Sequence, residues 1–390
     1  MALLAICPER ALTPLEEIRD AIIVVDGRRI VAVGRRGELR LPPGAQKYSA
    51  PGITVVPGFV DVHIHGAGGH DVMESTPEAL GAVAASVARR GTTSLVATTV
   101  TASTEHICRA AQGIARYIAA QPERPPKTTP VAEILGIHFE GPFINLARRG
   151  VHPAEWIVPP SIPALRRYVD AAGGAARICT LAPELPGALD LIEAARTAGL
   201  VVGLGHTDAT YAQARAAIEK GARHAVHVFN AMRPFSHRET GVLGAVLTTA
   251  NVSAELIADG VHVDAPAMRL LLAAKGASHV LLVSDGTAAT GMPDGKYRLG
   301  TFEVSVVGGV CRNAEGKLAG SALTLDRALR NVVALGTSLS DAVRMLTLNA
   351  ARLLGLERCK GVLAPGADAD LVLLDANLEV VGVMTRGTGL

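Results

Sequence analysis

Short apolar and β-branched runs alternate with longer stretches of helical periodicity between about residues 57 and 290. A run of four to eight apolar residues is typical of a buried strand, and apolar residues three or four positions apart over a longer stretch are typical of a helix. The expected strands cover residues 59–65, 93–99, 134–140, 177–182, 200–206, 224–229, 252–258 and 279–285. Helical stretches cover residues 76–90, 103–120, 187–198, 209–220 and 265–275. Eight strands alternating with helices predict an α/β fold, a (β/α)8 TIM-like barrel.

A doubly wound open sheet is the competing interpretation of this alternation. Dinucleotide-binding sheets of that kind carry a G-x-G-x-x-G turn after their first strand, and no such turn follows residues 59–65. Past residue 290, residues 297–311 predict an inserted hairpin, and residues 323–335 and 340–354 predict helices. The barrel is therefore the favoured interpretation.

The two ends of the chain share a different, β-rich pattern. Residues 18–34 form two β-branched runs around an Asp-Gly pair, which is a strong hairpin signal. Residues 361–375 end in a buried-strand pattern that can pair with the N-terminal strands. We therefore expect a small, discontinuous β-sandwich domain from residues 1–56 and 357–390, and a catalytic barrel from residues 57–356.

Composition narrows the class of protein. With 390 residues, 49% of them hydrophobic, the chain can bury a large core, and its net charge of +2 comes without clustered Lys and Arg. A nucleic-acid surface would need such clusters. The five cysteines are scattered without a C-x-x-C pair, which disfavours a disulfide framework and a thiolate zinc site. Apolar runs stay short of the roughly 20 residues of a membrane helix. We expect a cytoplasmic protein without membrane or nucleic-acid partners.

Metal-binding residue types recur at the ends of the expected strands. The first strand offers two histidines in an i, i+2 spacing, which places both side chains on one face of a strand. Carboxyl ends of barrel strands form the active sites of this fold. The residues in question are His63, His65, Glu140, His206, His227 and Asp285.

Each of these residues has an ordinary structural interpretation when taken alone. A single His-x-His is a weak signal, and a lone carboxylate after a strand is commonly a helix cap. Structural histidines have no reason, however, to gather at the same end of successive strands. The set therefore predicts one or two divalent metal ions per subunit, with Zn²⁺ favoured and iron, cobalt or manganese possible.

Specific motifs then identify a family resemblance. Residues 57–66 read PGFVDVHIHG, residues 138–143 read HFEGPF and residues 227–232 read HVFNAM. In this order, and with DGVH at 259–262 and SDG at 284–286, the chain resembles the N-acetylglucosamine-6-phosphate deacetylases of the amidohydrolase superfamily over almost its whole length. The first motif marks only the superfamily, whereas the other two long motifs are much more specific.

The resemblance implies a ligand set for the metal. Glu140, His206 and His227 would hold one ion. Some members of the family lack histidines at the two first-strand positions and use one metal. This chain has His63 and His65 there, which implies a second ion bridged by Glu140.

The resemblance also implies the remaining catalytic roles. Asp285 would take a proton from the attacking water and deliver it to the departing amine, because an amine leaves poorly as an anion. His262 would contact the substrate near its acetamide, and His152 would lie along the sugar.

Phosphate recognition is a further implication of the resemblance. Asn230, the backbone of Ala231 and Arg238 would surround the phosphate of a phosphorylated N-acetyl amino sugar. In related enzymes the arginine can come from a neighbouring subunit, which implies a homodimer. The family usually has proline where this chain has Thr240, and a proline there would stiffen the backbone of this loop.

Three alternatives remain open at this stage. The substrate could be the galactosamine epimer, since no residue distinguishes the two sugars. The reaction could instead be hydrolysis of a cyclic amide, but such barrels commonly bridge their metals with a carboxylated lysine, and the expected strands contain no lysine. A catalytically dead scaffold would be expected to have lost ligands or the base, and all of these positions are filled.

Overall fold

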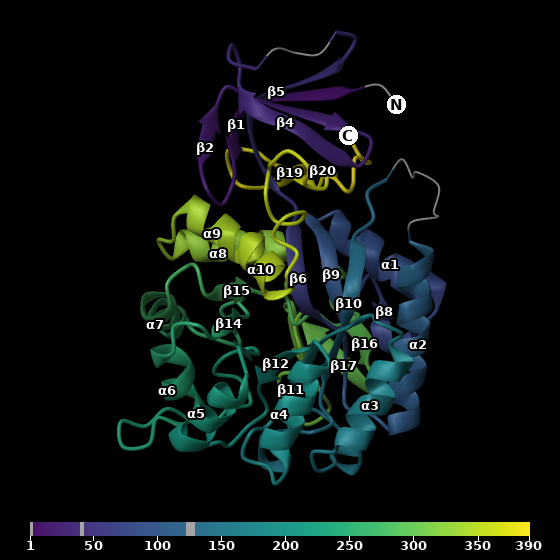
Figure 1. Cartoon of the computed structure of the whole chain (residues 1–390), viewed down its shortest axis with the longest axis vertical. Coiled ribbons are helices and arrows are strands. Elements are labelled where there is room, and N and C mark those ends of the chain that lie inside the picture. Colours follow the sequence, from purple (N-terminus) through teal and green to yellow (C-terminus); the bar gives the residue numbers. More distant parts are fainter. Residues whose placement is uncertain (1–2, 40–42, 122–128) are drawn as a thin grey trace.

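The computed structural model describes residues 3–39, 43–121 and 129–390 of the chain. A small sheet at one end of the molecule is built from both chain termini, and a larger α/β body forms the rest (Figure 1). None of the helices in the described ranges combines the length and the apolar character needed to cross a membrane.

The α/β body is built on eight parallel strands. In order around the sheet they are β6 (Phe59–Ile64), β9 (Thr92–Thr99), β10 (Glu133–Glu140), β11 (Ala176–Leu181), β12 (Val201–Leu204), β13 (His224–Ala225), β14 (Ser253–Leu256) and β15 (Val280–Leu282). Each expected strand is present, although the last four are shorter than their patterns suggested. The predicted fold class is confirmed.

Backbone hydrogen bonds bring the first strand against the segment that follows the last. Asp285 N–H donates to the carbonyl of His63 over 2.9 Å, and His65 N–H donates to the carbonyl of Gly286 over 2.8 Å. This closure of the barrel places Asp285 beside the two histidines of the first strand.

Helices surround the barrel on its outside (Figure 1). They are α1 (Pro77–Ala88), α2 (Thr104–Ala120), α3 (Ile162–Ala171), α4 (Ala188–Thr197), α5 (Tyr211–Lys220), α6 (Gly241–Thr248) and α7 (Ala265–Lys275). Most begin at a side chain that caps the first turn, such as Ser103 for α2 and Asp264 for α7. Helices α3 and α6 were not among the predicted elements.

Three further helices follow the barrel strands: α8 (Leu325–Ala334), α9 (Leu339–Leu346) and α10 (Leu348–Leu353). Helices α9 and α10 pack against β6 and β15, on either side of the closure. The single helix predicted over 340–354 is wrong, because it is interrupted at Thr347. The Thr347 hydroxyl donates to the carbonyl of Val343 over 2.6 Å, and its backbone leaves the helical conformation (φ −132°, ψ −84°).

Short strands and 3-10 turns lie in the connections between the barrel elements. A three-stranded antiparallel meander, rather than the predicted two-stranded hairpin, consists of β16 (Gly295–Leu299), β17 (Phe302–Val307) and β18 (Val310–Arg312). A two-stranded pair, β7 (Gly66–Ala67) with β8 (His70–Asp71), follows the first barrel strand. The 3-10 turns are η1 (Val72–Glu74), η2 (Leu146–Arg148) and η3 (Ala154–Trp156).

The terminal strands form one seven-stranded sheet. They are β1 (Leu4–Leu12), β2 (Glu17–Arg19), β3 (Ala21–Asp26), β4 (Arg29–Arg35), β5 (Gln46–Pro57), β19 (Leu371–Leu374) and β20 (Val380–Met384). Strand β19 pairs antiparallel with β5, as expected for a C-terminal strand that returns to the N-terminal unit. The boundaries at residues 56/57 and 356/357 stay a prediction.

A buried cluster of charges lies where the small sheet meets the start of β10. The ammonium of Lys360, only 3% exposed, lies 2.6 Å from Glu133, 2.8 Å from Asp368 and 2.7 Å from Asp370. Arg386 adds a second cation 3.0 Å from Glu133. Because the Lys360 ammonium has three N–H donors and three carboxylates accept them, the hydrogen-bonding capacity of this ammonium is filled within the cluster.

Candidate metal centre and active site

A cavity of about 180 Å³ opens at the carboxyl ends of the barrel strands. Nine of the eleven residues singled out from the sequence line it: His65, Glu140, His152, His206, His227, Asn230, Ala231, His262 and Asp285. Of the other two, His63 lies fully buried behind this surface, and Arg238 lies outside the lining.

Left-handed turns aim several of these side chains. His206, His227 and Asp285 have φ angles of 47°, 29° and 47°, immediately after or near the ends of β12, β13 and β15. Residues other than glycine rarely adopt this conformation, and when they do it is frequently at functional sites. The strands therefore end before these residues, and the turns direct their side chains toward the barrel axis.

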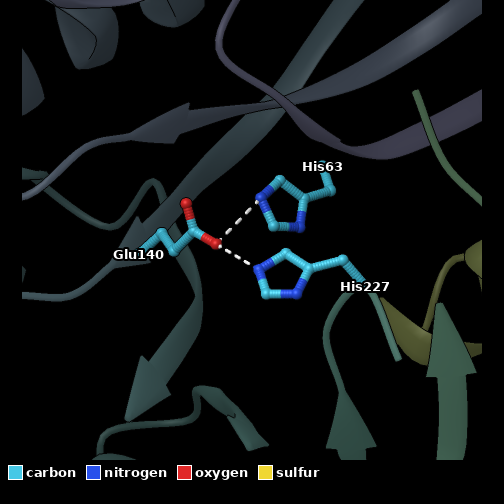
Figure 2. A group of neighbouring side chains, drawn as sticks. All are labelled: His63, Glu140 and His227. Carbon is cyan, nitrogen blue, oxygen red and sulfur yellow. Dashed lines mark hydrogen bonds and ion pairs between the residues drawn. The ribbon is translucent and has the colours of Figure 1, made fainter. Parts of the chain in front are cut away.

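One oxygen of Glu140 gathers three imidazoles from different parts of the barrel. Its Oε1 lies 3.3 Å from His63 Nε2, 3.2 Å from His206 Nε2 and 2.9 Å from His227 Nε2. Figure 2 shows His63 and His227 side by side, both directed toward the same oxygen of this carboxylate. The two nitrogens of His206 and His227 are themselves only 3.1 Å apart.

The second oxygen of Glu140 faces a second group of potential metal-ligand atoms. Glu140 Oε2 lies 3.2 Å from His65 Nε2, and the same nitrogen lies 3.2 Å from Asp285 Oδ1. Asp285 Oδ1 also lies 3.6 Å from His63 Nε2. Glu140 thus stands between two overlapping sets of nitrogen and oxygen atoms.

The opposite ring nitrogens fix which atoms face the centre. His65 Nδ1 is 3.0 Å from the carbonyl of Thr98, and His206 Nδ1 is 3.0 Å from the carbonyl of Arg148. A carbonyl can only accept, so both Nδ1 atoms carry hydrogens, and a neutral ring presents its Nε2 lone pair to the cluster. This is the tautomer that metal-ligating histidines adopt.

These donors fit a divalent cation. Three groups have ligand atoms within 4.8 Å of one another: His63 with Glu140 and His227, His63 with His65 and Asp285, and Glu140 with His152 and His206. In addition, His63 Nε2 is a buried atom without a well-aligned hydrogen-bond partner. Imidazole nitrogens and carboxylate oxygens suit zinc, cobalt and iron.

Electrostatics favour positive charge in this cluster. Burial raises the pKa of Glu140, but the charge of His63 and hydrogen bonds from the surrounding imidazoles hold it well below its usual range. Burial also raises the pKa of Asp285, and the hydrogen bond with His65 outweighs it, so this pKa lies below its usual value. Both carboxylates are therefore ionised at neutral pH.

The pKa values of two imidazoles in the cluster shift in opposite directions. Burial lowers the pKa of His206 to about 4, which keeps this ring neutral. Burial also lowers the pKa of His65, but hydrogen bonds with Asp285 and Glu140 reverse the effect and raise it to about 10. The two carboxylates thus attract either a proton on His65 or a cation in its place.

Two further histidines have their Nδ1 atoms occupied by neighbours, which leaves Nε2 for contacts in the cavity. Thr101 N–H donates to His152 Nδ1 over 3.2 Å, so the hydrogen of a neutral His152 ring sits on Nε2, which is 3.4 Å from Glu140. His262 Nδ1 lies 2.7 Å from Asp259 Oδ2, which leaves its Nε2 for other contacts. Both arrangements suit contact with a substrate.

The loop after His227 holds the residues expected around a phosphate. Asn230 lines the cavity and donates from its side chain to the carbonyl of His227 over 3.2 Å, and Ala231 beside it has a φ of 52°. Arg238 is exposed, and its own chain does not bring it to the cavity lining.

A glutamate anchors the loop in which Thr240 stands where the family usually has a proline. Thr240 precedes α6 without a side-chain cap. Glu239 Oε1 instead accepts from the N–H groups of Tyr211 and Gly241, both over 2.9 Å. The loop is therefore anchored despite the substitution.

Sequence reasoning missed Glu255 on β14, which is 0% exposed and lies 2.8 Å from His63 Nδ1. The signal was present, because Glu255 is the one charged residue in the apolar expected strand 252–258. Burying an unpaired charge costs several kcal/mol, so a carboxylate there indicates a partner. Leu318 and Gly320, which also line the cavity, carried no comparable signal.

Comparison with known proteins supports the same interpretation. The model of the amidohydrolase family matches residues 54–389. The chain is 35% identical, over 96% of its length and 94% of the relative's, to N-acetylglucosamine-6-phosphate deacetylase of Bacillus subtilis. It is 40% identical to N-acetylgalactosamine-6-phosphate deacetylase of Escherichia coli O157:H7, covering 85% of this chain and 86% of the relative.

A solved structure extends the likeness to three dimensions. It is a D267A mutant of N-acetyl-D-glucosamine-6-phosphate deacetylase from Mycobacterium smegmatis in complex with N-acetyl-D-glucosamine-6-phosphate. It has a TM-score of 0.91 and 39% identity, covering 100% of this chain and 99% of that one. The chain described here therefore belongs to the amidohydrolase family, and within it to the group that includes the N-acetylglucosamine-6-phosphate deacetylases.

Proposed function

We propose that the chain hydrolyses the acetamide of N-acetyl-D-glucosamine 6-phosphate to D-glucosamine 6-phosphate and acetate, in amino-sugar catabolism. One observation carries the proposal: Glu140 is surrounded by imidazoles beside Asp285, at the carboxyl ends of the barrel strands. The relatives of this chain that carry the deacetylase names are 34% to 40% identical to it.

Glu140, His206 and His227 would hold one divalent ion, and His63 and His65 would hold a second that Glu140 bridges. Three imidazole or carboxylate ligands with an open position are typical of catalytic zinc, so zinc is favoured. A bound ion would supply Lewis acidity that lets water ionise near neutral pH and that polarises a carbonyl.

Asp285 moves the proton in this scheme. Its ionised carboxylate accepts a proton from the water that attacks the acetamide carbon. The carbon–nitrogen bond then breaks as Asp285 returns this proton to the amine nitrogen, which leaves as a neutral amine. The closeness of Asp285 Oδ1 to His65 Nε2, at 3.2 Å, supports this role because it places the base at the edge of the cluster.

His262 and His152 orient the substrate. Asp259 accepts from Nδ1 of His262 and would stabilise an imidazolium, whose Nε2–H can donate to the acetamide oxygen, where negative charge develops in the transition state. His152 directs its Nε2–H into the cavity and binds along the sugar.

Asn230, the backbone of Ala231 and Arg238 bind the phosphate in this proposal. Arg238 is exposed and outside the cavity of its own chain. A homodimer in which the arginine of each subunit completes the phosphate site of the other would account for its position. Guanidinium groups suit this task because they bind phosphate through paired, charge-assisted hydrogen bonds.

The substrate epimer is the main alternative. The relative from Escherichia coli O157:H7 that is named for the galactosamine sugar is 40% identical to this chain, against 35% for the Bacillus subtilis glucosamine enzyme. Measuring acetate release from both 6-phosphate sugars tests the proposal. A higher kcat/KM for the glucosamine sugar supports it, and a higher kcat/KM for the galactosamine sugar assigns the alternative.

Cyclic-amide hydrolysis is less well supported. The bridging position is taken by Glu140, and no lysine lies among the described residues that line the cavity.

A cytoplasmic location of the enzyme is also part of the proposal. All five cysteines are unpaired, which suits the reducing environment of the cytoplasm.

A further inference from the structure

Glu255 lies at the centre of the barrel, outside the cavity lining. It is the third residue of β14, is 0% exposed, and sits behind His63, away from the space a substrate could enter. A carboxylate in this position has no direct part in the chemistry. Its contacts nevertheless lead to two residues of the proposed metal centre.

The two oxygens of Glu255 have separate partners. Oε2 lies 2.8 Å from His63 Nδ1 and accepts from the backbone N–H of His227 over 2.9 Å. Oε1 lies 2.7 Å from His224 Nε2. One side chain therefore connects β6, β13 and β14, and a single oxygen contacts the two histidines that share Glu140 Oε1 (Figure 2).

These contacts determine which nitrogen of His63 faces the cluster. The N–H of His227 can only donate, so Oε2 is an acceptor. Any proton shared with His224 lies at Oε1, and His63 therefore donates to Oε2 from Nδ1. In a neutral His63 the lone pair is then on Nε2, the buried atom without a well-aligned hydrogen-bond partner, 3.3 Å from Glu140 Oε1.

We propose that Glu255 is a positioning residue for the metal centre, which holds His63 in the ligand tautomer and fixes the backbone of His227. The inference rests on the proposed function, since it presupposes a metal centre at Glu140. Carboxylate partners of ligating histidines orient the ring and raise its basicity, and their loss typically weakens metal binding about 10- to 100-fold.

A purely structural role would be the simpler explanation, because any buried carboxylate with this many partners contributes to stability. The two roles differ in the measured quantity that the loss of Glu255 would change. A structural role changes the free energy of unfolding of the metal-free chain. A positioning role changes the affinity and the ligand geometry of the ion in a chain that is folded.

The test is titration of the metal-free chain with Co²⁺, followed by visible absorption, which reports ligand type and geometry. Glu255→Gln keeps the shape and an acceptor oxygen but removes the charge, and we expect Co²⁺ to bind about 10-fold more weakly. Glu255→Ala removes the acceptor, and we expect a loss of about 100-fold with an altered spectrum.

Asp326→Asn is the matched control. Asp326 is 1% exposed and pairs with Arg330 at 3.2 Å, on helix α8 and away from the cavity lining. This variant should bind Co²⁺ like the wild type. If Asp326→Asn weakens Co²⁺ binding as much as Glu255→Gln does, the effect is a general one and the proposal is overturned.

The remaining outcomes separate this inference from the proposed function. A wild-type chain that binds no Co²⁺ refutes the metal centre itself. If the wild type binds Co²⁺ and Glu255→Gln binds it equally tightly with the same spectrum, only the role of Glu255 is overturned. The Gln variant decides the matter even if Glu255→Ala does not fold.

Discussion

In the described part of the chain, a buried polar cluster at the start of strand β10 and another at its end differ in one respect. At the start of β10, Lys360 meets three carboxylates at 2.6 to 2.8 Å. At the end of β10, Glu140 meets imidazole nitrogens at 2.9 to 3.4 Å, and two of these nitrogens face each other at 3.1 Å. The first cluster contains its own cation, the Lys360 ammonium. The second brings together imidazole nitrogens and carboxylate oxygens, whose lone pairs suit a cation.

The difference separates structure from chemistry. Burial lowers the pKa of Lys360, but the carboxylates of Asp370, Glu133 and Asp368 outweigh it and raise this pKa, so the ammonium stays charged. The Lys360 cluster therefore joins the small sheet to the barrel without further ligands. The Glu140 cluster becomes equally satisfied only when a cation occupies it.

The largest expected effect concerns the base of the second cluster. Asp285→Asn should lower kcat by about 10²- to 10⁴-fold, because an amide cannot carry the proton from water to the amine. The metal content, measured by elemental analysis, should remain at the wild-type level. Near-normal turnover in this variant would contradict the assignment.

Breaking the first cluster should affect stability instead. Lys360→Met leaves the buried Asp370 without its cation and removes one of the two cations that Glu133 and Asp368 each contact. It should destabilise the chain by about 3–5 kcal/mol, measured by urea unfolding. Lys296→Met, which removes the exposed partner of Glu303, is the control and should change little. If Lys360→Met unfolds like the wild type, the cluster does not hold the two parts together.

A smaller effect is expected at the phosphate. Arg238→Ala should raise KM for the phosphorylated sugar about 10- to 100-fold, which corresponds to the loss of a charged hydrogen bond, with little change in kcat. The exposed Arg109 on helix α2, changed to Ala, serves as the control. An unchanged KM in Arg238→Ala would remove this residue from the phosphate site. Mixing Arg238→Ala with an inactive Asp285→Asn chain would test whether the arginine acts across a dimer.

The smallest effect should depend on pH. Burial raises the pKa of Asp259, but its hydrogen bonds with His262 outweigh burial and place this pKa below the ordinary 3.8. A depressed carboxyl pKa stabilises the folded chain above pH 3.8 and loses this contribution as the pH falls through the lower, folded-state value. Asp259→Asn should therefore cost about 1 kcal/mol at neutral pH, and urea unfolding should show the difference shrinking below pH 3.8. A difference that is constant with pH would contradict this account.

Much of the fold was accessible from the sequence. The alternation of apolar runs and helices predicted the barrel, and the ends of parallel strands must meet at one rim. Glu140 could therefore be placed near His206 and His227 without any contact information. The roles of His152 and His262, which lie on loops, came only from the family resemblance.

The remainder depends on tertiary packing. The patterns extended strands through His206, His227 and Asp285, although these residues turn into left-handed conformations that no local pattern encodes. Helix α6 has the sequence GVLGAVLT, whose glycines and β-branched residues disfavour a helix unless packing stabilises it. The partners of Glu255 are 28, 31 and 192 residues away along the chain, beyond the reach of local periodicity.

The most direct test of the central claim is acetate release from N-acetylglucosamine 6-phosphate before and after metal removal. A chain stripped by a chelator, and shown by elemental analysis to contain no divalent ion, should lose turnover and regain it with stoichiometric Zn²⁺. Full turnover in the demonstrably metal-free chain would contradict the account.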